Sequence, residues 1–376
     1  MSAPRKILLV FPVGERGGAE RVFAAIARHL DRRRFEPVAW FLRPGSLVQE
    51  IQALGVPTFL DPITRLSDPV NYWRTVKAGR QLIINESIQL VLSSLGYGHL
   101  YGGVAALCAN VDAIWWQHGI ASLTNWIDQL AAAVPAKLII TSSYIAARAH
   151  ADALSLNGTP LTIIHPGIEP APDRVWDRQL VLKEFGIEPG ATVVAAISRL
   201  QPGKGQDVLI RAASLLIERY RQVMFLVVGS ELFNKSQGYE SMLKRLAVEL
   251  GVADHIVFTG LRHDIDRLLS AIDVFVHPAT APESFGLAVV EAMAAGKPVI
   301  VTDVGGPRET VVDGYTGMII PPRDVQQLVH ALAVLIERPS LREAMGQAAR
   351  AHVLEHFSQQ TMIRKVESAL AAVLEC

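Results

Sequence analysis

The sequence predicts an α/β protein with two domains, each organised around a parallel β-sheet. The chain has 376 residues, which is too many for one small core and suits two domains of ordinary size. Half of the residues are hydrophobic and only 19% are charged, so disorder is excluded as the main state. Short unbroken apolar runs alternate with helical patterns along the chain. Such runs are typical of strands buried on both faces, as in parallel sheets.

The first half begins with a strand, a glycine-rich turn and a helix. Residues 7–13 form the apolar run, glycines follow at positions 14, 17 and 18, and a helical pattern starts at Ala19. Apolar side chains fall on one face of that helix, as expected of a helix that packs on a sheet: Val22, Phe23, Ile26 and Leu30. Further short apolar strands are expected at residues 90–93, 138–141 and 161–164.

The same order of elements recurs in the second half. A strand is expected over 192–198, followed by Gly203, Gly205 and a helix from about 206 to 220, and later strands at 224–228, 256–258, 274–276 and 299–301. The repeat predicts two Rossmann-like domains, at residues 1–168 and 174–357, joined by the proline- and glycine-rich segment 165–172. Apolar residues spaced four apart predict a final helix at about 358–376, and the sequence leaves open whether it packs back on the first domain.

The charge balance argues against a nucleic-acid partner. The chain carries 36 Lys and Arg and 36 Asp and Glu, whereas nucleic-acid binding usually requires a basic surplus. Residues 1–168 carry 15 basic and 11 acidic side chains. This local surplus is compatible with an anionic ligand or with peripheral contact at the inner face of a membrane, although a solvated face is the favoured interpretation.

Cysteine content and the N-terminal sequence indicate a cytoplasmic protein. Cys108 and Cys376 offer neither a disulfide framework nor zinc-ligand spacing, which fits a reducing compartment. The first apolar run is short and is followed at once by Glu15 and Arg16, so it is interpreted as a strand and not as a signal peptide. No apolar run is long enough to predict a membrane span.

Two loops that follow strands could bind phosphate. The loop at 14–20 lacks the G-x-G-x-x-G pattern, and Arg43 stands where a dinucleotide-binding domain would carry an acid, so a nicotinamide cofactor is not favoured. The loop at 198–205 places Arg199 and Lys204 close to a helix start. Two fixed cations suit a diphosphate, and a surface turn with solvated cations is the alternative.

The segment 282–299 is the most informative part of the chain. Glu283 and Glu291 stand eight positions apart, the first in a loop and the second near the second turn of a helix that starts around Gly286. The amides of Phe285, Gly286 and Leu287 at that helix start would favour a phosphate group. An acid–base pair of the hydrolase kind is compatible with this spacing but is not required by it.

These residues resemble a known family. The run E-S-F-G-L-A-V-V-E-A-M-A-A-G-K-P-V is similar to the E-x7-E signature of the retaining glycosyltransferases with the GT-B fold, in particular glycosyltransferase family 4. The stretch 304–317 resembles the G-G-x-x-E-x-V-x-D-G-x-T-G motif of that family, 197–205 resembles its phosphate loop, and 17–20 resembles its N-terminal glycine loop. The resemblance covers nearly the whole chain and implies two Rossmann-like domains that face each other across a cleft.

The resemblance implies roles for residues of the second domain. Arg199 and Lys204 would hold the donor diphosphate and stabilise it as it leaves. Glu283 and the backbone of Phe285, Gly286 and Leu287 would hold the donor sugar hydroxyls and the distal phosphate. Glu291 would bind the ribose.

It also implies roles in the first domain. Gly17 and Gly18 would lie under the phosphates, and His118 would lie near the sugar, with a structural turn residue as the alternative. Acceptor contacts are expected from the first domain, where Glu20 and His99 are candidates. Glu20 is equally well explained as an acid in the first turn of a helix.

Two departures from the family pattern bear on this transfer. Many relatives carry Asn-Gly-Val-Asp at the linker, where this chain has residues 165–169, so no role in the site is carried over to the linker. Asp264 and Asp266 spell D-x-D, a metal-binding signature of another glycosyltransferase fold, but helix capping is the favoured explanation. Because two cations are available for the diphosphate, activity without a metal or other cofactor is expected.

The resulting hypothesis is a retaining hexosyltransferase. It would move a sugar from a nucleotide sugar, UDP-sugar being favoured over GDP-mannose, to a hydroxyl of a saccharide or lipid-linked acceptor in bacterial polysaccharide, lipopolysaccharide or glycolipid synthesis. A front-face route, in which the leaving phosphate accepts the acceptor proton, is the proposed mechanism. The alternatives are a GT-B-fold sugar-nucleotide epimerase or hydrolase, and a non-catalytic subunit that binds nucleotide sugars.

Overall fold

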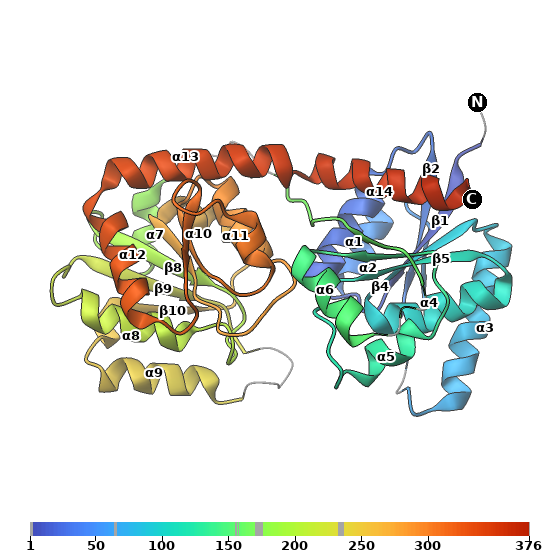
Figure 1. Ribbon diagram of the computed structural model, residues 1–376, viewed down its shortest axis with the longest axis horizontal. Coiled ribbons are helices and arrows are strands. Elements are labelled where there is room, and N and C mark those ends of the chain that lie inside the picture. Colours follow the sequence, from blue (N-terminus) through green and yellow to red (C-terminus); the bar gives the residue numbers. More distant parts are fainter. Residues whose placement is uncertain are drawn as a thin grey trace. The chain divides into compact units, whose positions relative to one another are not determined.

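The chain folds into two compact units. The computed structural model describes residues 3–63, 66–154, 156, 158–169, 176–231 and 237–375. One unit comprises Met1–Gly167 together with Gln359–Cys376, and the other comprises Ile168–Ser358 (Figure 1). The part of the predicted linker at 170–172 lies outside the described residues.

The first unit contains a seven-stranded parallel sheet. Its strands are β1 (Arg5–Phe11), β2 (Phe35–Phe41), β3 (Thr58–Leu60), β4 (Leu90–Ser94), β5 (Asp112–Gln117), β6 (Leu138–Thr141) and β7 (Leu161–Ile163), in the order β3-β2-β1-β4-β5-β6-β7. The first strand ends at Phe11, earlier than predicted, because Pro12 has no amide hydrogen to continue the ladder. The order reverses between β1 and β4, and ligands of open α/β sheets bind at such a reversal, beyond the carboxyl ends of the strands.

Helices cover both faces of this sheet. They are α1 (Gly18–His29), α2 (Ser46–Ala53), α3 (Pro69–Asn85), α4 (Leu95–Ala109), α5 (Trp126–Ala132), α6 (Tyr144–Ala153) and α14 (Gln359–Leu374). Side chains alternate across the strands, so Ile7 and Leu9 join one core cluster while Leu8 joins another. Val366 and Leu370 of α14 lie in the first of these clusters, so this helix completes the core of the first unit (Figure 1).

The second unit contains a six-stranded parallel sheet. Its strands are β8 (Thr192–Ile197), β9 (Val223–Val228), β10 (Ile256–Gly260), β11 (Val274–His277), β12 (Val299–Thr302) and β13 (Gly317–Ile320), in the order β10-β9-β8-β11-β12-β13. The order reverses between β8 and β11. Residues just after these two strands are therefore placed for ligand binding.

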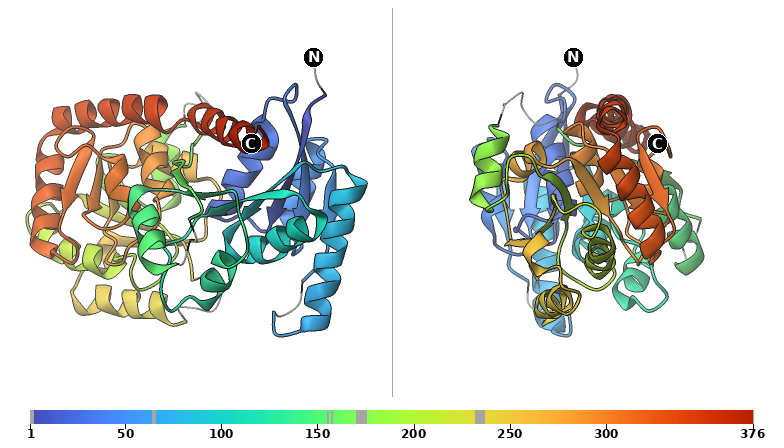
Figure 2. Two further views of the ribbon diagram at one scale, coloured as in Figure 1. Left: turned by 45° about the vertical axis from the view of Figure 1, so that its right-hand side comes forward. Right: turned by 90° about the vertical axis from the view of Figure 1, so that its left-hand side faces the viewer.

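Helices again cover both faces of the sheet, and Figure 2 shows these layers from two further sides. They are α7 (Arg178–Glu184), α8 (Gln206–Leu216), α9 (Tyr239–Glu249), α10 (Ile265–Ala271), α11 (Leu287–Ala294), α12 (Val325–Glu337) and α13 (Pro339–His356), with short 3-10 helices at η1 (Ala253–His255) and η2 (Gly306–Thr310). Two parallel Rossmann-like sheets confirm the predicted fold class. Among the described residues, no helix has the length and apolar character needed to cross a membrane.

Candidate active site

The loop after β8 is locked to the segment after β11. The backbone amides of Thr280 and Ala281 both donate to the carbonyl oxygen of Gly203, at 2.9 and 3.2 Å. Gly205 has φ +74° and lies so close to Pro278 that a side chain there would clash with the Pro278 carbonyl oxygen. The two loops therefore form one continuous edge at the carboxyl ends of these strands.

Gln206 shapes the part of this edge that carries Arg199. Its side chain is buried, and its Nε2 donates to the Oγ of Ser198 and to the carbonyl oxygen of Arg199, both at 2.9 Å. The Arg199 side chain itself is exposed. Gln206 is not among the site residues predicted from the sequence, because this first residue of α8 belongs to no recognisable motif.

Lys204, Glu283 and His277 form a contiguous polar cluster. The Glu283 carboxylate contacts the Lys204 ammonium through Oε2 and the His277 ring through Oε1. The side chains are 13%, 22% and 4% exposed for Lys204, Glu283 and His277, respectively. Burial alone would raise the pKa of Glu283, but His277 and Lys204 hold it well below the usual range of a glutamate. The carboxylate is therefore charged at neutral pH.

The structure adds His277 to the residues considered from the sequence. It is the last residue of β11, one position beyond the strand predicted at 274–276. A polar residue that ends an otherwise apolar strand was the available signal.

Close backbone packing supports the start of α11 beside Glu283. Gly286 is the N-cap residue with φ +88°, and a side chain there would meet Pro307 and approach Oε1 of Glu283. The amide of Gly306 donates to the carbonyl oxygen of Glu283 at 2.7 Å, and a side chain at Gly306 would clash with the Ser284 carbonyl oxygen. These close approaches explain why glycines occupy both positions.

The remaining predicted donor residues lie along the same helix. Leu287 is its first residue, and its amide is positioned before the first intrahelical bonds, which run from Val289 and Val290 to the Gly286 carbonyl oxygen. Glu291 lies in the second turn and is half-buried. Phe285 is 3% exposed and belongs to the core, so only its backbone is available to a ligand.

His118 in the first unit is a buried, neutral histidine. It stacks on Trp116 and meets Phe23 edge-on, with ring centroids 5.0 and 5.7 Å away. Burial lowers the pKa of His118 to about 3. Its Nε2 has no hydrogen-bond partner among the described residues. A buried nitrogen in this state is suited to a hydrogen bond from or to a ligand hydroxyl.

A buried polar network fixes the turn that carries His118. The Oε1 of Gln117 accepts a hydrogen bond from the Gly119 amide at 3.1 Å, and the Gln117 side chain also bonds to the Asp128 carboxyl group. Asn125 donates to the same carboxyl group at 2.5 Å. Burial raises the pKa of Asp128 to about 6.

Glu20 lies over the N-terminus of its own helix. Gly17 is the N-cap residue of α1 and Gly18 the first residue, and a side chain at Gly17 would clash with the Glu20 carboxylate. Glu20 is buried, which raises its pKa, and its carboxylate accepts a hydrogen bond from its own amide. This arrangement agrees with the first-turn explanation.

His99 occupies the core of the first unit. Its Nδ1 pairs with the Ser93 Oγ at 2.8 Å, its Nε2 pairs with the Val134 carbonyl oxygen at 3.2 Å, and its ring stacks on Trp115. Burial lowers the pKa of His99 to about 4. Because both ring nitrogens are engaged, we leave His99 out of the proposed acceptor site.

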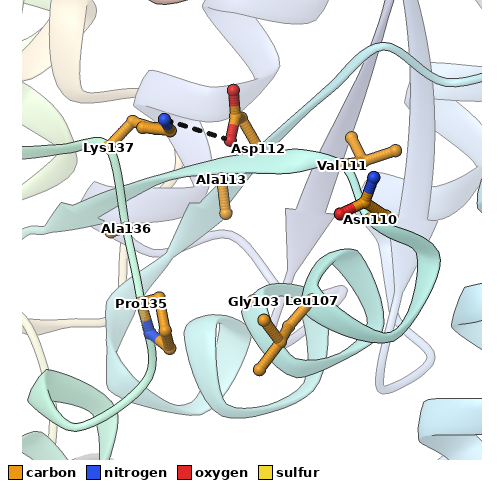
Figure 3. Close-up of a pocket in the computed structure, with 9 residues that line it drawn as sticks. All are labelled: Gly103, Leu107, Asn110, Val111, Asp112, Ala113, Pro135, Ala136 and Lys137. Atoms are coloured by element: carbon orange, nitrogen blue, oxygen red, sulfur yellow. Dashed lines mark ion pairs between the residues drawn. The ribbon is translucent and has the colours of Figure 1, made fainter.

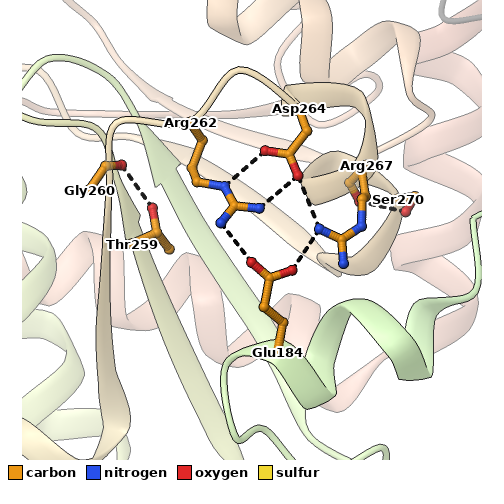
Figure 4. Close-up of polar contacts among 7 residues, drawn as sticks. All are labelled: Glu184, Thr259, Gly260, Arg262, Asp264, Arg267 and Ser270. Carbon is orange, nitrogen blue, oxygen red and sulfur yellow. Dashed lines mark hydrogen bonds and ion pairs between the residues drawn. The ribbon is translucent and has the colours of Figure 1, made fainter.

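The Asp264 carboxylate belongs to a ring of charges and does not cap its helix. Asp264 is the N-cap residue of α10, but its side chain makes no cap hydrogen bond and instead pairs with Arg262 and Arg267, at 2.7 and 3.1 Å (Figure 4). Both arginines also bind Glu184, at 2.6 Å. The capping explanation was therefore wrong in mechanism, because guanidinium groups two and three positions away compete for the carboxylate. In the described part of the chain, no group of three or more His, Cys, Asp or Glu is arranged to hold a metal ion.

A separate cavity lies where strand β5 of the first sheet begins. It has a volume of about 170 Å³ and is lined in part by Gly103, Leu107, Asp112 and Lys137 (Figure 3). Asp112 begins β5, whereas His118 follows the end of that strand. The cavity is therefore distinct from the candidate site, and its Lys137–Asp112 pair spans 3.8 Å.

Solved structures with this fold define the class of protein. Anabaena Alr3699/HepE, solved in complex with UDP-glucose, superposes with a TM-score of 0.84 at 26% identity over 98% of this chain and 99% of that chain. A glycosyltransferase from Rickettsia africae ESF-5 superposes with a TM-score of 0.88 over 99% of each chain, and its 21% identity supports the fold alone. The chain has the GT-B fold.

Sequence comparison gives the family. The model described as glycosyl transferases group 1 matches residues 177–352, and the model described as Glycosyltransferase Family 4 matches residues 16–171. The chain belongs to glycosyltransferase family 4, as its motifs predicted.

Curated relatives match this chain over part of their length. The D-inositol 3-phosphate glycosyltransferase of Nocardia farcinica is 34% identical over 220 residues, or 57% of this chain and 48% of the relative. The GDP-mannose-dependent monoacylated alpha-(1-6)-phosphatidylinositol monomannoside mannosyltransferase of Corynebacterium glutamicum is 36% identical over 202 residues, or 52% and 51%. The chain thus spans about half the length of the curated relatives it matches.

Proposed function

We propose that the protein is a retaining glycosyltransferase that moves a hexose-type sugar from a nucleotide sugar to a hydroxyl group. The observation that carries this proposal is the cluster of Lys204, Glu283 and His277 beside the start of α11. It places an ammonium group, a charged carboxylate and helix-terminal amides together, which suits a ligand with both phosphates and hydroxyls.

Charge stabilisation is the main task of the second unit in this proposal. As the bond between the anomeric carbon and the phosphate oxygen breaks, negative charge builds on the departing diphosphate. Lys204 and the exposed Arg199 are the cations available on the β8 loop. One such contact contributes about 3–4 kcal/mol to the transition state. We therefore assign leaving-group stabilisation to these two residues.

Glu283 is proposed to bind the sugar hydroxyls, and His118 keeps the role near the sugar that the family resemblance implies. Glu283 is charged and can accept hydrogen bonds from hydroxyls. His118 is neutral, so its unpartnered Nε2 can bond a hydroxyl without adding a positive charge near the reacting carbon. Glu291 and the loop at Gly17 and Gly18 keep the ribose and phosphate roles that the family resemblance implies.

A front-face route accounts for retention. The acceptor oxygen forms its bond to the anomeric carbon on the side from which the diphosphate departs, and the acceptor proton passes to the leaving phosphate oxygen. We favour this route because the proposal assigns Glu283 to the sugar hydroxyls and His277 engages its carboxylate, which makes it a poor covalent nucleophile. A product with an inverted anomeric carbon, detected by NMR coupling constants, would refute it.

The donor and the acceptor are proposed by class. The structure of HepE with UDP-glucose supports a UDP-sugar, and the GDP-mannose-dependent relative keeps GDP-mannose as the alternative. The acceptor is a saccharide or a lipid-linked saccharide, and no metal is expected to be required. Cytoplasmic location and peripheral membrane contact remain predictions from the sequence.

The first experiment is a thermal-shift panel with UDP, GDP, ADP and TDP, with and without their sugars, in EDTA. A ligand at ~100 times its Kd stabilises the fold by ~2.7 kcal/mol, which is readily visible as a shift in Tm. A shift with one diphosphate in EDTA supports the proposal and identifies the base. Donor consumption without an acceptor would favour an epimerase or hydrolase, and binding without turnover would favour a silent subunit.

A substitution then tests the assignment of Lys204. Lys204→Ala is expected to lower kcat at least a hundredfold while weakening donor binding less, because the contact strengthens as charge develops. Lys244→Ala is the matched control, since Lys244 pairs with Glu240 on the exposed side of α9. Donor affinity lost with turnover preserved would contradict the assignment.

A further inference from the structure

The Glu283 carboxylate is held from two sides by groups of different mobility. Lys204 reaches Oε2 with a long side chain from a loop, whereas His277 reaches Oε1 from the end of a central strand. His277 pairs in register with Val301 of β12, and its side chain is 4% exposed. The histidine is therefore the fixed partner and the lysine the movable one.

Binding of a diphosphate changes which of these two partners contacts Glu283. In the proposed function, on which this inference rests, Lys204 turns to the donor diphosphate. The Glu283 carboxylate, 22% exposed, then loses one of its two cationic or hydrogen-bonding partners. A partly buried carboxylate that loses a partner will rotate unless another donor holds it.

We propose that His277 is a positioning residue that keeps the Glu283 carboxylate directed at the donor sugar once Lys204 has turned to the diphosphate. The Nε2–H of a neutral imidazole is sufficient to hold Oε1, so no change of charge on the ring is needed. With Oε1 held, Oε2 is released by Lys204 and becomes free to accept from a sugar hydroxyl. A histidine that merely fills the core would affect stability but would not distinguish a nucleotide from its sugar derivative.

Paired substitutions separate these two roles. His277→Leu removes the donor at similar volume, and His277→Gln places an amide N–H near the original Nε2. His255→Leu is the control, because His255 lies in η1 and its Nδ1 pairs with the Val223 carbonyl oxygen, away from the cluster. Calorimetric titration gives the Kd for the nucleoside diphosphate chosen by the panel above and for its sugar derivative.

The expected result is a selective loss. In His277→Leu the Kd for the nucleoside diphosphate stays within about twofold, while the Kd for the nucleotide sugar rises at least tenfold, equivalent to ~1.4 kcal/mol. His277→Gln recovers most of that affinity, and His255→Leu behaves as the unsubstituted protein. Equal losses for both ligands, no loss for either, or a Gln variant as weak as the Leu variant would overturn the inference.

A measurement on the unsubstituted protein covers the case in which a variant does not fold. Nitrogen-15 NMR of histidine-labelled protein, with the donor bound, is expected to show the His277 Nε2–H present. An Nδ1–H tautomer would overturn the inference. A protein that transfers sugar yet tolerates His277→Leu fails only this inference, whereas a protein that binds no nucleotide sugar fails the proposed function as well.

Discussion

Lowering the pH from 7.5 to 5.5 should destabilise the first unit through its buried histidines, above all His99 and His118. Burial depresses the pKa of His99 to about 4 and that of His118 to about 3, against about 6.5 for an unfolded histidine. When folding lowers the pKa of a group, the stability associated with that group is fully present above its pKa in the unfolded chain. This stability is lost as the pH falls toward its pKa in the folded state. At pH 5.5 each histidine therefore costs ~1.4 kcal/mol, or nearly 3 kcal/mol together, in the free energy of unfolding.

Carboxyl groups in the same unit act in the opposite direction. Burial raises the pKa of Asp128 to about 6 and also raises that of Glu20, so their protonation stabilises the folded state as the pH falls. The observed decrease should therefore be smaller than the histidine contribution alone. His99→Gln removes one of these histidine titrations and should reduce the change in the free energy of unfolding between pH 7.5 and 5.5 by ~1.4 kcal/mol.

Tryptophan fluorescence is a suitable probe for this measurement. Five of the six tryptophans belong to the first unit, and Trp115 and Trp116 stack directly on the two histidines. Urea unfolding at pH 7.5, 6.5 and 5.5 gives the free energy at each pH. A free energy that rises on acidification, or a His99→Gln slope equal to that of the unsubstituted protein, would refute the argument.

Two further substitutions test other parts of the structure. Gly205→Ala should lower the Tm of the second unit and weaken nucleotide binding. A positive φ costs about 1–2 kcal/mol for alanine, and the added carbon meets the Pro278 carbonyl oxygen. A calorimetric Tm equal to that of the unsubstituted protein would contradict this. Asp264→Asn should cost about 1 kcal/mol in urea unfolding, an effect that shrinks in 1 M salt, because the charge ring is partly exposed. A Mg²⁺-dependent stabilisation that this variant abolishes would instead favour the metal hypothesis.

The fold could be predicted because its signals are local. Apolar runs such as 192–198 and the turn glycines that follow them depend on neighbouring residues alone, and the structure contains β8 and α8 in that place. The end of α8 at Leu216, four residues before the predicted end, reflects the usual difficulty with helix termini.

The site was only partly predictable because its contacts are not local. Lys204 and Glu283 are 79 positions apart and meet only through the packing of two loops. No periodic sequence pattern shows how the two loops pack against each other or that His277 contacts Glu283. Burial of His99 is likewise a tertiary property, and the sequence could not distinguish it from an exposed histidine in a loop.

The helix α14 gives the first unit an unusual order of synthesis. Its residues Val366 and Leu370 complete a core whose strands begin at β1, yet they are translated only after the whole second unit. At roughly 5–20 residues per second, the first unit waits on the order of 10–40 s for this last helix. During that interval the second unit can fold completely, while the apolar face that α14 covers stays open to chaperones. The unit that the ribosome makes first is thus the last to become complete.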